Sequence, residues 1–416
     1  MRARVAMLAL LAIATGCDRR KRVGEGAYAE TVHDAIPKIE QATGLKYKSP
    51  PKLELRSREQ VRQFLLRNLD EETPASELRG EEQALKLFGL IPDTLNLRPF
   101  LIDLLTEQII GYYDPATKVL YVVREAPEDL ASLTVTHELV HALQDQYVNL
   151  DSIEKDHHNS DRTDAAKAVL EGQAVYIQMQ VMLGSDLATR LPGGSEQMRQ
   201  QIRENQSSMP KFANAPMAIQ ESLIFPYLSG WDFIRRFNQH FPRKSPLGDL
   251  PVSTEQILSE KAYFGTPRDM PTDVILPAVR DSSAYEETMG EFGTRLFLYQ
   301  HLKDNTVAVG AAAGWDGDRY RVVRAGKGLG IVWVSVWDTP FDEAQFVDAL
   351  GQAIGKRYNT AAPSLSGTGA RTYTGSGRTV VITPRAIKGR SIVVYADVPA
   401  GASPALIDPA RITLGQ

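Results

Sequence analysis

The sequence contains a single cysteine among its 416 residues. One thiol excludes an intrachain disulfide framework and any zinc or iron–sulfur site built on several cysteines. The chain also has little net charge, because its 47 Lys and Arg nearly balance its 51 Asp and Glu. This balance excludes a strongly basic nucleic-acid-binding protein. No apolar run beyond the N-terminal segment approaches the 18 residues that would indicate a membrane-spanning helix.

The N-terminal segment has the pattern of a bacterial lipoprotein signal. Arg2 and Arg4 precede a short apolar run, residues 5–14, and the small residues Ala-Thr-Gly lead to Cys17. The order resembles a lipobox, which implies a signal peptide over 1–16 and a lipidated tether over 17–26. A plain signal peptide with an incidental cysteine is the alternative. We therefore expect a lipid anchor on Cys17 that holds the chain on a membrane of the bacterial cell envelope, facing the periplasm or the exterior.

Hydrophobic periodicity predicts a mixture of helices and strands. Helices are expected at 27–43, 57–70, 81–90, 95–107, 127–147, 164–183, 221–239, 254–261, 284–302 and 341–357. Strands are expected at 52–55, 319–324, 331–337, 379–383 and 391–396, and a β-hairpin with arms 108–113 and 118–123. The polar stretch 184–218 is expected to form a flap, and the tail past Asp397 to be loosely ordered.

The helix predicted at 127–147 carries the motif His-Glu-Leu-Val-His. His137 and His141 are four residues apart, so both imidazoles leave the same helix face one turn apart. That separation lets two neutral imidazoles bind one zinc ion. Glu138 can then reach a metal-bound water and act as its general base. A pair of ordinary surface histidines on an amphipathic helix is the alternative.

A catalytic zinc site needs a third protein ligand, and Glu171 is the expected one. It lies 30 residues beyond His141 on the next predicted helix, where its helical neighbours are apolar. A carboxylate facing a core is costly unless something pairs with it. The alternatives are a salt bridge from Glu171 to Lys167, or His157 or His158 as the third ligand. Gly172, in mid-helix, indicates a close approach of the active-site helix.

Three further residues are candidates for supporting roles. Asp145 lies one turn past His141 and could hold a ligand imidazole in one tautomer, although a solvated helix charge is an equal alternative. Tyr227 is the candidate donor to the oxyanion of a tetrahedral intermediate, with Tyr176 as the second candidate. A buried tyrosine whose hydroxyl is satisfied within the core is the alternative for Tyr227.

This set of residues resembles the gluzincin branch of zinc metallopeptidases, in which HExxH is completed by a Glu on the next helix. The resemblance implies that His137, His141 and Glu171 bind one Zn²⁺ per chain and that Glu138 is the base. Val175 stands where thermolysin-type enzymes have an acid, so their substrate subsites do not transfer.

A closer likeness is to bacterial envelope proteins of the peptidase MA-like kind, over roughly residues 95–350. The matching segments are 111–115, 137–146, 170–174, 225–227, 253–258 and 314–320. In this fold a hairpin strand before the active-site helix pairs with an extended substrate, which implies 108–113 or 118–123 as the substrate-binding strand.

The expected fold class is α+β, with a zincin-like metallopeptidase domain over 27–279 and a smaller α+β module over 280–416. Residues 315–318, Trp-Asp-Gly-Asp, are expected to form a turn rather than a cation site. The expected function is a membrane-anchored zinc metallopeptidase that hydrolyses peptides or proteins outside the cytoplasm, with no nucleic-acid partner. Two alternatives stay open: an inactive zincin-fold lipoprotein used for binding or envelope assembly, and a zinc amidase acting on cell-wall peptides.

Overall fold

The structure is a computed structural model that describes residues 28–72, 74–154, 159–184, 194–204, 209–279, 284–360, 362–367 and 369–415. Its fold is mixed α+β, as the sequence predicts. The signal segment, Cys17 and the tether lie outside the described residues, as do His157 and His158. Among the helices of the described ranges, none is both long enough and apolar enough to cross a membrane.

The N-terminal part is mainly helical. Its helices are α1 (Ala29–Thr43), α2 (Arg58–Glu72), α3 (Ala75–Leu87), α4 (Leu97–Gln108), α5 (Glu128–Gln144), α6 (Leu150–Glu154), α7 (Ser160–Leu183), α9 (Gly194–Glu204), α10 (Pro210–Ala213), α11 (Met217–His240), α12 (Thr254–Leu258) and α13 (Glu260–Phe264), with a 3-10 turn η2 (Pro246–Gly248). Its strands are β1 (Lys52–Arg56), β2 (Gly111–Asp114), β3 (Val119–Val123) and β4 (Val274–Ile275).

The C-terminal part is built on one large sheet. Its elements are β5 (Tyr285–Glu287), α14 (Gly290–Leu302), α15 (Asn305–Ala312), β6 (Trp315–Ala325), β7 (Gly328–Trp337), α16 (Pro340–Tyr358), β8 (Ser364–Leu365), β9 (Arg371–Gly375), β10 (Arg378–Ile387), β11 (Arg390–Pro399), the 3-10 turn η3 (Pro409–Arg411) and β12 (Thr413–Leu414). Seven strands pair in the order β5-β6-β7-β11-β10-β9-β8, each antiparallel to its neighbours.

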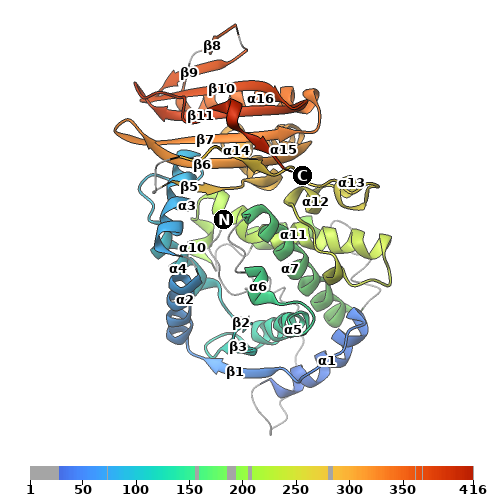
Figure 1. Ribbon diagram of the computed structural model, residues 1–416. Helices are drawn as coiled ribbons and strands as arrows, with labels where there is room; N and C mark the ends of the chain where they lie inside the picture. Colours follow the sequence, from blue (N-terminus) through green and yellow to red (C-terminus); the bar gives the residue numbers. More distant parts are fainter. Residues whose placement is uncertain are drawn as a thin grey trace.

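The large sheet lies at one end of the molecule and the small sheet β1-β3-β2 at the other, with α5, α7 and α11 between them (Figure 1). The predicted hairpin is confirmed, since β2 pairs with β3 in the register Gly111↔Val122. β1 adds parallel to β3, with Leu53 opposite Leu120. β3 is therefore the central strand, and 118–123 is wrong as a substrate-binding strand because both of its edges are already paired.

Alternating side chains of the large sheet bury both of its faces. On β7, Ile331 and Trp333 join the core formed with α14, α15 and α16. The intervening Val332 and Val334 join a second core that includes Ile412 from the tail. The expectation of a loosely ordered tail is therefore wrong, because the tail covers an apolar sheet face and β12 pairs there with β4.

The segment predicted as a turn at 315–318 is instead the start of β6, with a bulge between Trp315 and Gly317. Asp318 is buried and accepts hydrogen bonds from the indole nitrogens of Trp315 (3.0 Å) and Trp333 (2.9 Å). Its carboxylate thus has a structural role. The turn prediction failed because the Asp and Gly residues that usually mark turns here serve a bulge and a buried hydrogen-bond network.

Other differences concern where elements begin and end. Part of the expected flap at 184–218 is helical, because α9 and α10 lie within it, and the rest of it falls largely outside the described residues. The helix predicted at 254–261 is two short helices that meet at Ser259. Ser253 and Ser259 cap them by accepting hydrogen bonds from the backbone N–H of Gln256 (3.2 Å) and Ala262 (3.3 Å).

Helices α7 and α11 touch backbone to backbone where two glycines face each other. A Cβ atom added to Gly172 would lie 2.1 Å from the carbonyl carbon of Gly230, and one added to Gly230 would lie 1.9 Å from the carbonyl oxygen of Ala168. The sequence correctly indicates a close approach at Gly172, but the approaching helix is α11 and not the predicted active-site helix. This crossing sets the position of α7 relative to α11.

We expect Gly172→Ala to lower the free energy of unfolding by about 3 kcal/mol or more, because the new methyl group can fit only if the two helices separate. Gly310→Ala is the matched control, since nothing lies within 4 Å of a Cβ there in α15. That change should be neutral or stabilising by up to about 1 kcal/mol. Denaturant unfolding measures both variants, and equal stability of the two would contradict the close crossing.

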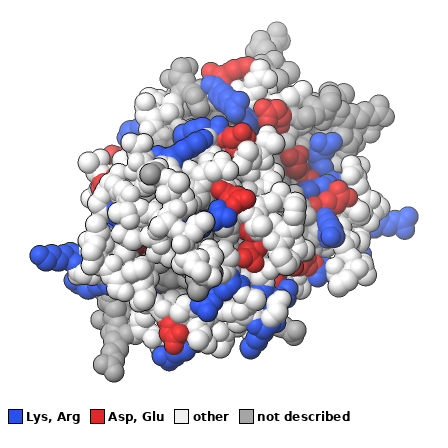
Figure 2. Space-filling model, turned by 90° about the horizontal axis from the view of Figure 1, so that it is seen from above, with Lys and Arg blue, Asp and Glu red and all other residues white. Residues whose placement is uncertain are grey.

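The face seen from above, at the large-sheet end, carries charged side chains of both signs (Figure 2). Lys and Arg side chains are interspersed there with Asp and Glu, and neither sign forms a continuous patch in this view. This distribution agrees with the small net charge of the whole chain.

Candidate metal centre

Helices α5 and α7 bring three side chains to one point in the interior. His137 and His141 come from α5 and Glu171 from α7, and all three are buried. His137 Nε2 lies 3.1 Å from His141 Nε2 and 3.1 Å from Glu171 Oε2, and His141 Nε2 lies 3.4 Å from the same oxygen. The alternative of surface histidines is therefore wrong. Glu171 faces the imidazoles, so its alternative pairing with Lys167 is also wrong.

These separations are those of ligand atoms around a tetrahedral ion. Nitrogen and oxygen ligands bind zinc at about 2.0–2.1 Å, so two of them at a tetrahedral angle are about 3.3–3.4 Å apart. The three observed separations, 3.1, 3.1 and 3.4 Å, are close to that value. The residues present therefore fit a zinc ion in size.

Two glutamine side chains fix which nitrogen of each imidazole carries hydrogen. Gln144 Oε1 lies 2.8 Å from His141 Nδ1, and Gln178 Oε1 lies 3.4 Å from His137 Nδ1. The amide nitrogen of Gln144 donates a hydrogen bond to the carbonyl of Leu170 (2.9 Å), and that of Gln178 donates one to the carbonyl of Leu133 (3.1 Å). These hydrogen bonds fix the orientation of each amide. Each Nδ1 is therefore the N–H donor, and each Nε2 presents a lone pair.

With neutral imidazoles the centre brings three acceptors together, so a proton or a cation must lie among them. The Nε2 lone pairs of His137 and His141 and the Glu171 carboxylate converge on the same space. Burial alone would raise the pKa of Glu171, but the neighbouring His141 and His137 outweigh it and hold that pKa at about 2. Burial alone would lower the pKa of His141, but Glu171 outweighs it and raises that pKa to about 9. The carboxylate therefore draws positive charge into this space, either as a proton on His141 or as a bound cation. A cation is what such a donor set accommodates, and imidazole nitrogens with one carboxylate suit zinc.

Glu138 lies beside this set and is completely buried. Its Oε2 accepts a hydrogen bond of 2.8 Å from the backbone N–H of Tyr113 on β2. Its Oε1 is buried with no hydrogen-bond partner among the described residues. Burial raises the pKa of Glu138 to about 8. The hairpin thus anchors one oxygen of this carboxylate and leaves the other available to a reacting group.

The two candidate tyrosines lie in different surroundings. Tyr227 follows Pro226 within α11, and its buried ring lies 6.1 Å, centroid to centroid, from the ring of His137. Tyr176 on α7 packs its ring 5.3 Å from that of Trp231. The structure therefore places the ring of Tyr227 beside that of His137, while the ring of Tyr176 packs on Trp231 of α11.

Asp145 does not have the contact predicted for it. Its carboxylate accepts hydrogen bonds of 2.7 Å from the hydroxyl of Tyr113 and from Lys118 Nζ, and it contacts neither imidazole. Asp145 caps the C-terminus of α5 with helical backbone angles, and its side chain faces the hairpin. Gln144 has the predicted role instead, and its spacing of three residues from His141 on the same helix is the signal that could have identified it.

We expect Gln144→Ala to weaken zinc binding by about 10–100-fold, because it removes the acceptor that orients the His141 ring. Competition with a chelator of known affinity measures the change. Gln63→Ala, on the exposed face of α2, is the control and should leave the affinity unchanged. Unaltered zinc affinity in a folded Gln144→Ala chain would contradict this role.

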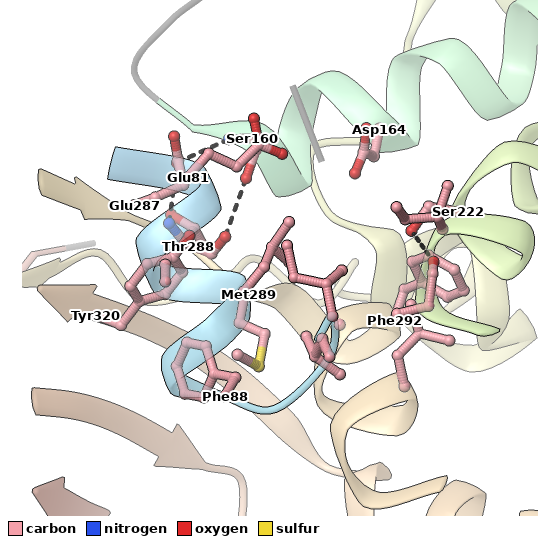
Figure 3. A pocket seen from close by; sticks show the side chains of 18 of the residues that line it. Glu81, Phe88, Ser160, Asp164, Ser222, Glu287, Thr288, Met289, Phe292 and Tyr320 are labelled. Atoms are coloured by element: carbon pink, nitrogen blue, oxygen red, sulfur yellow. Dashed lines mark hydrogen bonds between the residues drawn. The ribbon is translucent and has the colours of Figure 1, made fainter. Parts of the chain in front are cut away.

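A separate cavity lies at the junction of the N-terminal helices with the large sheet (Figure 3). Residues of α3, α7, α11 and α14 line it, and none of the three converging side chains is among them. At its edge Glu287 on β5 accepts a hydrogen bond of 3.0 Å from the backbone N–H of Ser160, the first residue of α7. This contact joins α7 to the C-terminal part.

The comparisons with known proteins bear only on the C-terminal part. Residues 278–397 match a family described as "Domain of unknown function (DUF8575)". The match runs from just before β5 to within β11, covers less than a third of the chain, and includes none of the residues of the candidate metal centre. No curated protein and no solved structure matches the chain.

Proposed function

We propose that this chain is a zinc-dependent metallopeptidase with a zincin-like catalytic domain. The observation that carries the proposal is the convergence of His137, His141 and Glu171 beside the unpartnered Oε1 of Glu138. A structural zinc site has no need of a buried carboxylate that stands next to the ligands and leaves one oxygen without a partner. A hydrolytic site does need one, because an attacking water must lose a proton.

Each protein group has a distinct part in the proposed reaction. A zinc ion held by the three ligands would polarise a water molecule and the substrate carbonyl. Glu138 accepts the proton of the attacking water at Oε1 and delivers it to the leaving amine nitrogen as the peptide bond breaks. The Tyr113 N–H keeps the other carboxylate oxygen in place throughout. Tyr227, beside His137, is the proposed donor to the developing oxyanion.

The small sheet supports a peptide as the substrate. β2 is an edge strand, and no strand of the described chain pairs with its second edge. An extended peptide added along that edge would be held by backbone hydrogen bonds. Because Tyr113 on β2 also contacts Glu138, such a peptide would run directly past the proposed base. The anchor at Cys17 would place this reaction in the cell envelope, and it remains a prediction of the sequence.

The test is proteolysis by the zinc-loaded chain. The purified protein is incubated with a reduced, unfolded protein, and new N-termini are identified by mass spectrometry. We expect cleavage that a zinc chelator stops and added zinc restores. Release of peptides from purified cell-wall sacculi without protein cleavage would favour the amidase alternative. No hydrolysis of either substrate by a chain that holds zinc would contradict the proposal and favour a binding role.

A further inference from the structure

A second cluster of potential ligands lies far from the metal centre in the sequence. Glu255 belongs to α12, Asp269 to the segment after α13, and Asp338 to the link between β7 and α16. One carboxylate oxygen from each lies within 4.8 Å of the others. α12 and α13 lie against the large-sheet end of the molecule (Figure 1), so the cluster joins the N-terminal part to the C-terminal sheet.

Glu255 is the informative member of this cluster. Only 5% of its surface is exposed, and its carboxylate has no hydrogen bond or ion pair with the described residues. The charges that act on it are all acidic, with Glu291, Asp269 and Asp338 the strongest. A buried carboxylate without a partner is strongly unfavourable in a folded protein unless a cation or a proton compensates it.

The pKa values record the same repulsion. Burial, followed by the charges of Glu291 and Asp269, raises the pKa of Glu255 to about 10. Burial, followed by Asp269, raises the pKa of Asp338 to about 7, although Lys261 opposes this shift. Lys261 forms no ion pair with Asp338 among the described residues. The cluster is thus short of positive charge.

The neighbouring acids are already paired and are not available as further ligands. Glu291 forms an ion pair with Arg295. Asp316 accepts a hydrogen bond of 2.9 Å from the hydroxyl of Thr272 and pairs with Arg390 at 3.1 Å. The unpaired acids are therefore the three whose oxygens converge.

We propose that Glu255, Asp269 and Asp338 form a binding site for a hard divalent cation, with calcium preferred. All three donors are carboxylate oxygens, with no imidazole or thiolate among them, which disfavours zinc. Calcium accepts several protein carboxylates in an irregular arrangement, whereas magnesium keeps most of its waters and usually binds only one or two carboxylates. Three converging carboxylates therefore suit calcium better than magnesium.

A cation at this place would connect three segments that otherwise repel one another. Thr254, next to Glu255, donates a hydrogen bond of 3.1 Å from its backbone to Asp161 in the first turn of α7. α7 carries Glu171, so the cation would also stabilise the helix that supplies the third ligand of the metal centre. The two sites share no residue, and each can be occupied without the other.

Terbium is a suitable probe because it prefers oxygen ligands as calcium does and its luminescence can be excited through a nearby tryptophan. Trp337 directly precedes Asp338. We expect the whole chain to bind one Tb³⁺ with tryptophan-sensitised emission that Ca²⁺ displaces and Mg²⁺ displaces poorly. Glu255→Gln and Asp338→Asn should each weaken this binding at least about tenfold. Asp348→Asn is the control, because it removes an exposed charge from α16, the helix that follows Asp338. This change should leave terbium binding unaltered.

Stability gives a second readout. Ca²⁺ at about 1 mM should raise the melting temperature of the wild-type and Glu171→Ala chains, and should have no such effect on Glu255→Gln. Terbium binding that survives Asp338→Asn would overturn the proposal. The proposal would also be overturned if Ca²⁺ left the melting temperature of the wild-type chain unchanged and Glu255→Gln alone raised it. The cluster would then be held together by shared protons and not by a cation. Neither result would affect the proposed peptidase.

Discussion

Glu138→Gln is expected to lower kcat/KM for peptide hydrolysis by about 10²–10⁴-fold while the chain keeps its zinc. The amide has nearly the shape of the carboxylate, and its oxygen can still accept the hydrogen bond from the backbone N–H of Tyr113. It cannot accept a proton from the attacking water. Because Glu138 is not one of the three proposed ligands, the change removes the proposed base and leaves those three residues intact.

The control for this experiment lies on the same helix. Glu128→Gln changes an exposed glutamate in the first turn of α5 and should leave both zinc content and activity unchanged. Parallel rates and zinc measurements on the three chains separate loss of the base from loss of the metal. A Glu138→Gln chain as active as the wild type would show that any hydrolysis arises elsewhere.

Glu171→Ala is expected to weaken zinc binding by more than about 100-fold. That factor is the upper end for losing a residue that only orients a ligand, and Glu171 is proposed as a ligand itself. The variant leaves two imidazoles, which form an incomplete site. It should still fold, because it removes a buried charge and because the crossing of α7 and α11 depends on Gly172 and Gly230.

Chelator competition measures this affinity, and circular dichroism shows that α7 remains helical. Glu196→Ala, at an exposed position of α9, is the control and should bind zinc as the wild type does. Wild-type affinity in Glu171→Ala would contradict the assignment of the third ligand. Because His157 and His158 were its competitors in the sequence, a His157→Ala, His158→Ala double variant would then be the next chain to measure.

Local patterns predicted the centre of this structure well. The spacing of His137 and His141, and the apolar surroundings of Glu171, were enough to bring these side chains together in the expected way. The hairpin was also recognised, since its strands and turn are adjacent in the sequence. The histidine pair and the hairpin are local features, whereas Glu171 reaches the imidazoles from another helix and was indicated by its apolar neighbours.

The sequence did not predict several other contacts between segments that lie far apart in the chain. The parallel pairing of β1 with β3, the cover of the large sheet by the tail, and the approach of α11 to Gly172 all depend on segments far apart in the chain. Asp145 has the helical spacing from His141 that the sequence indicated, but its carboxylate binds Tyr113 and Lys118 of the hairpin, which lie far away in the sequence. The contact of Gln178 with His137 was not predicted, because it depends on how α7 packs against α5.

The most direct measurement of the central claim is the zinc content of the whole chain, purified without chelators and analysed by elemental mass spectrometry. The three proposed ligands and the proposed base predict about one zinc per chain, removed by a strong chelator and restored by adding zinc back. Calcium is counted separately in the same analysis. A folded chain that holds no zinc, even after zinc is supplied, would contradict the metal centre and with it the proposed peptidase.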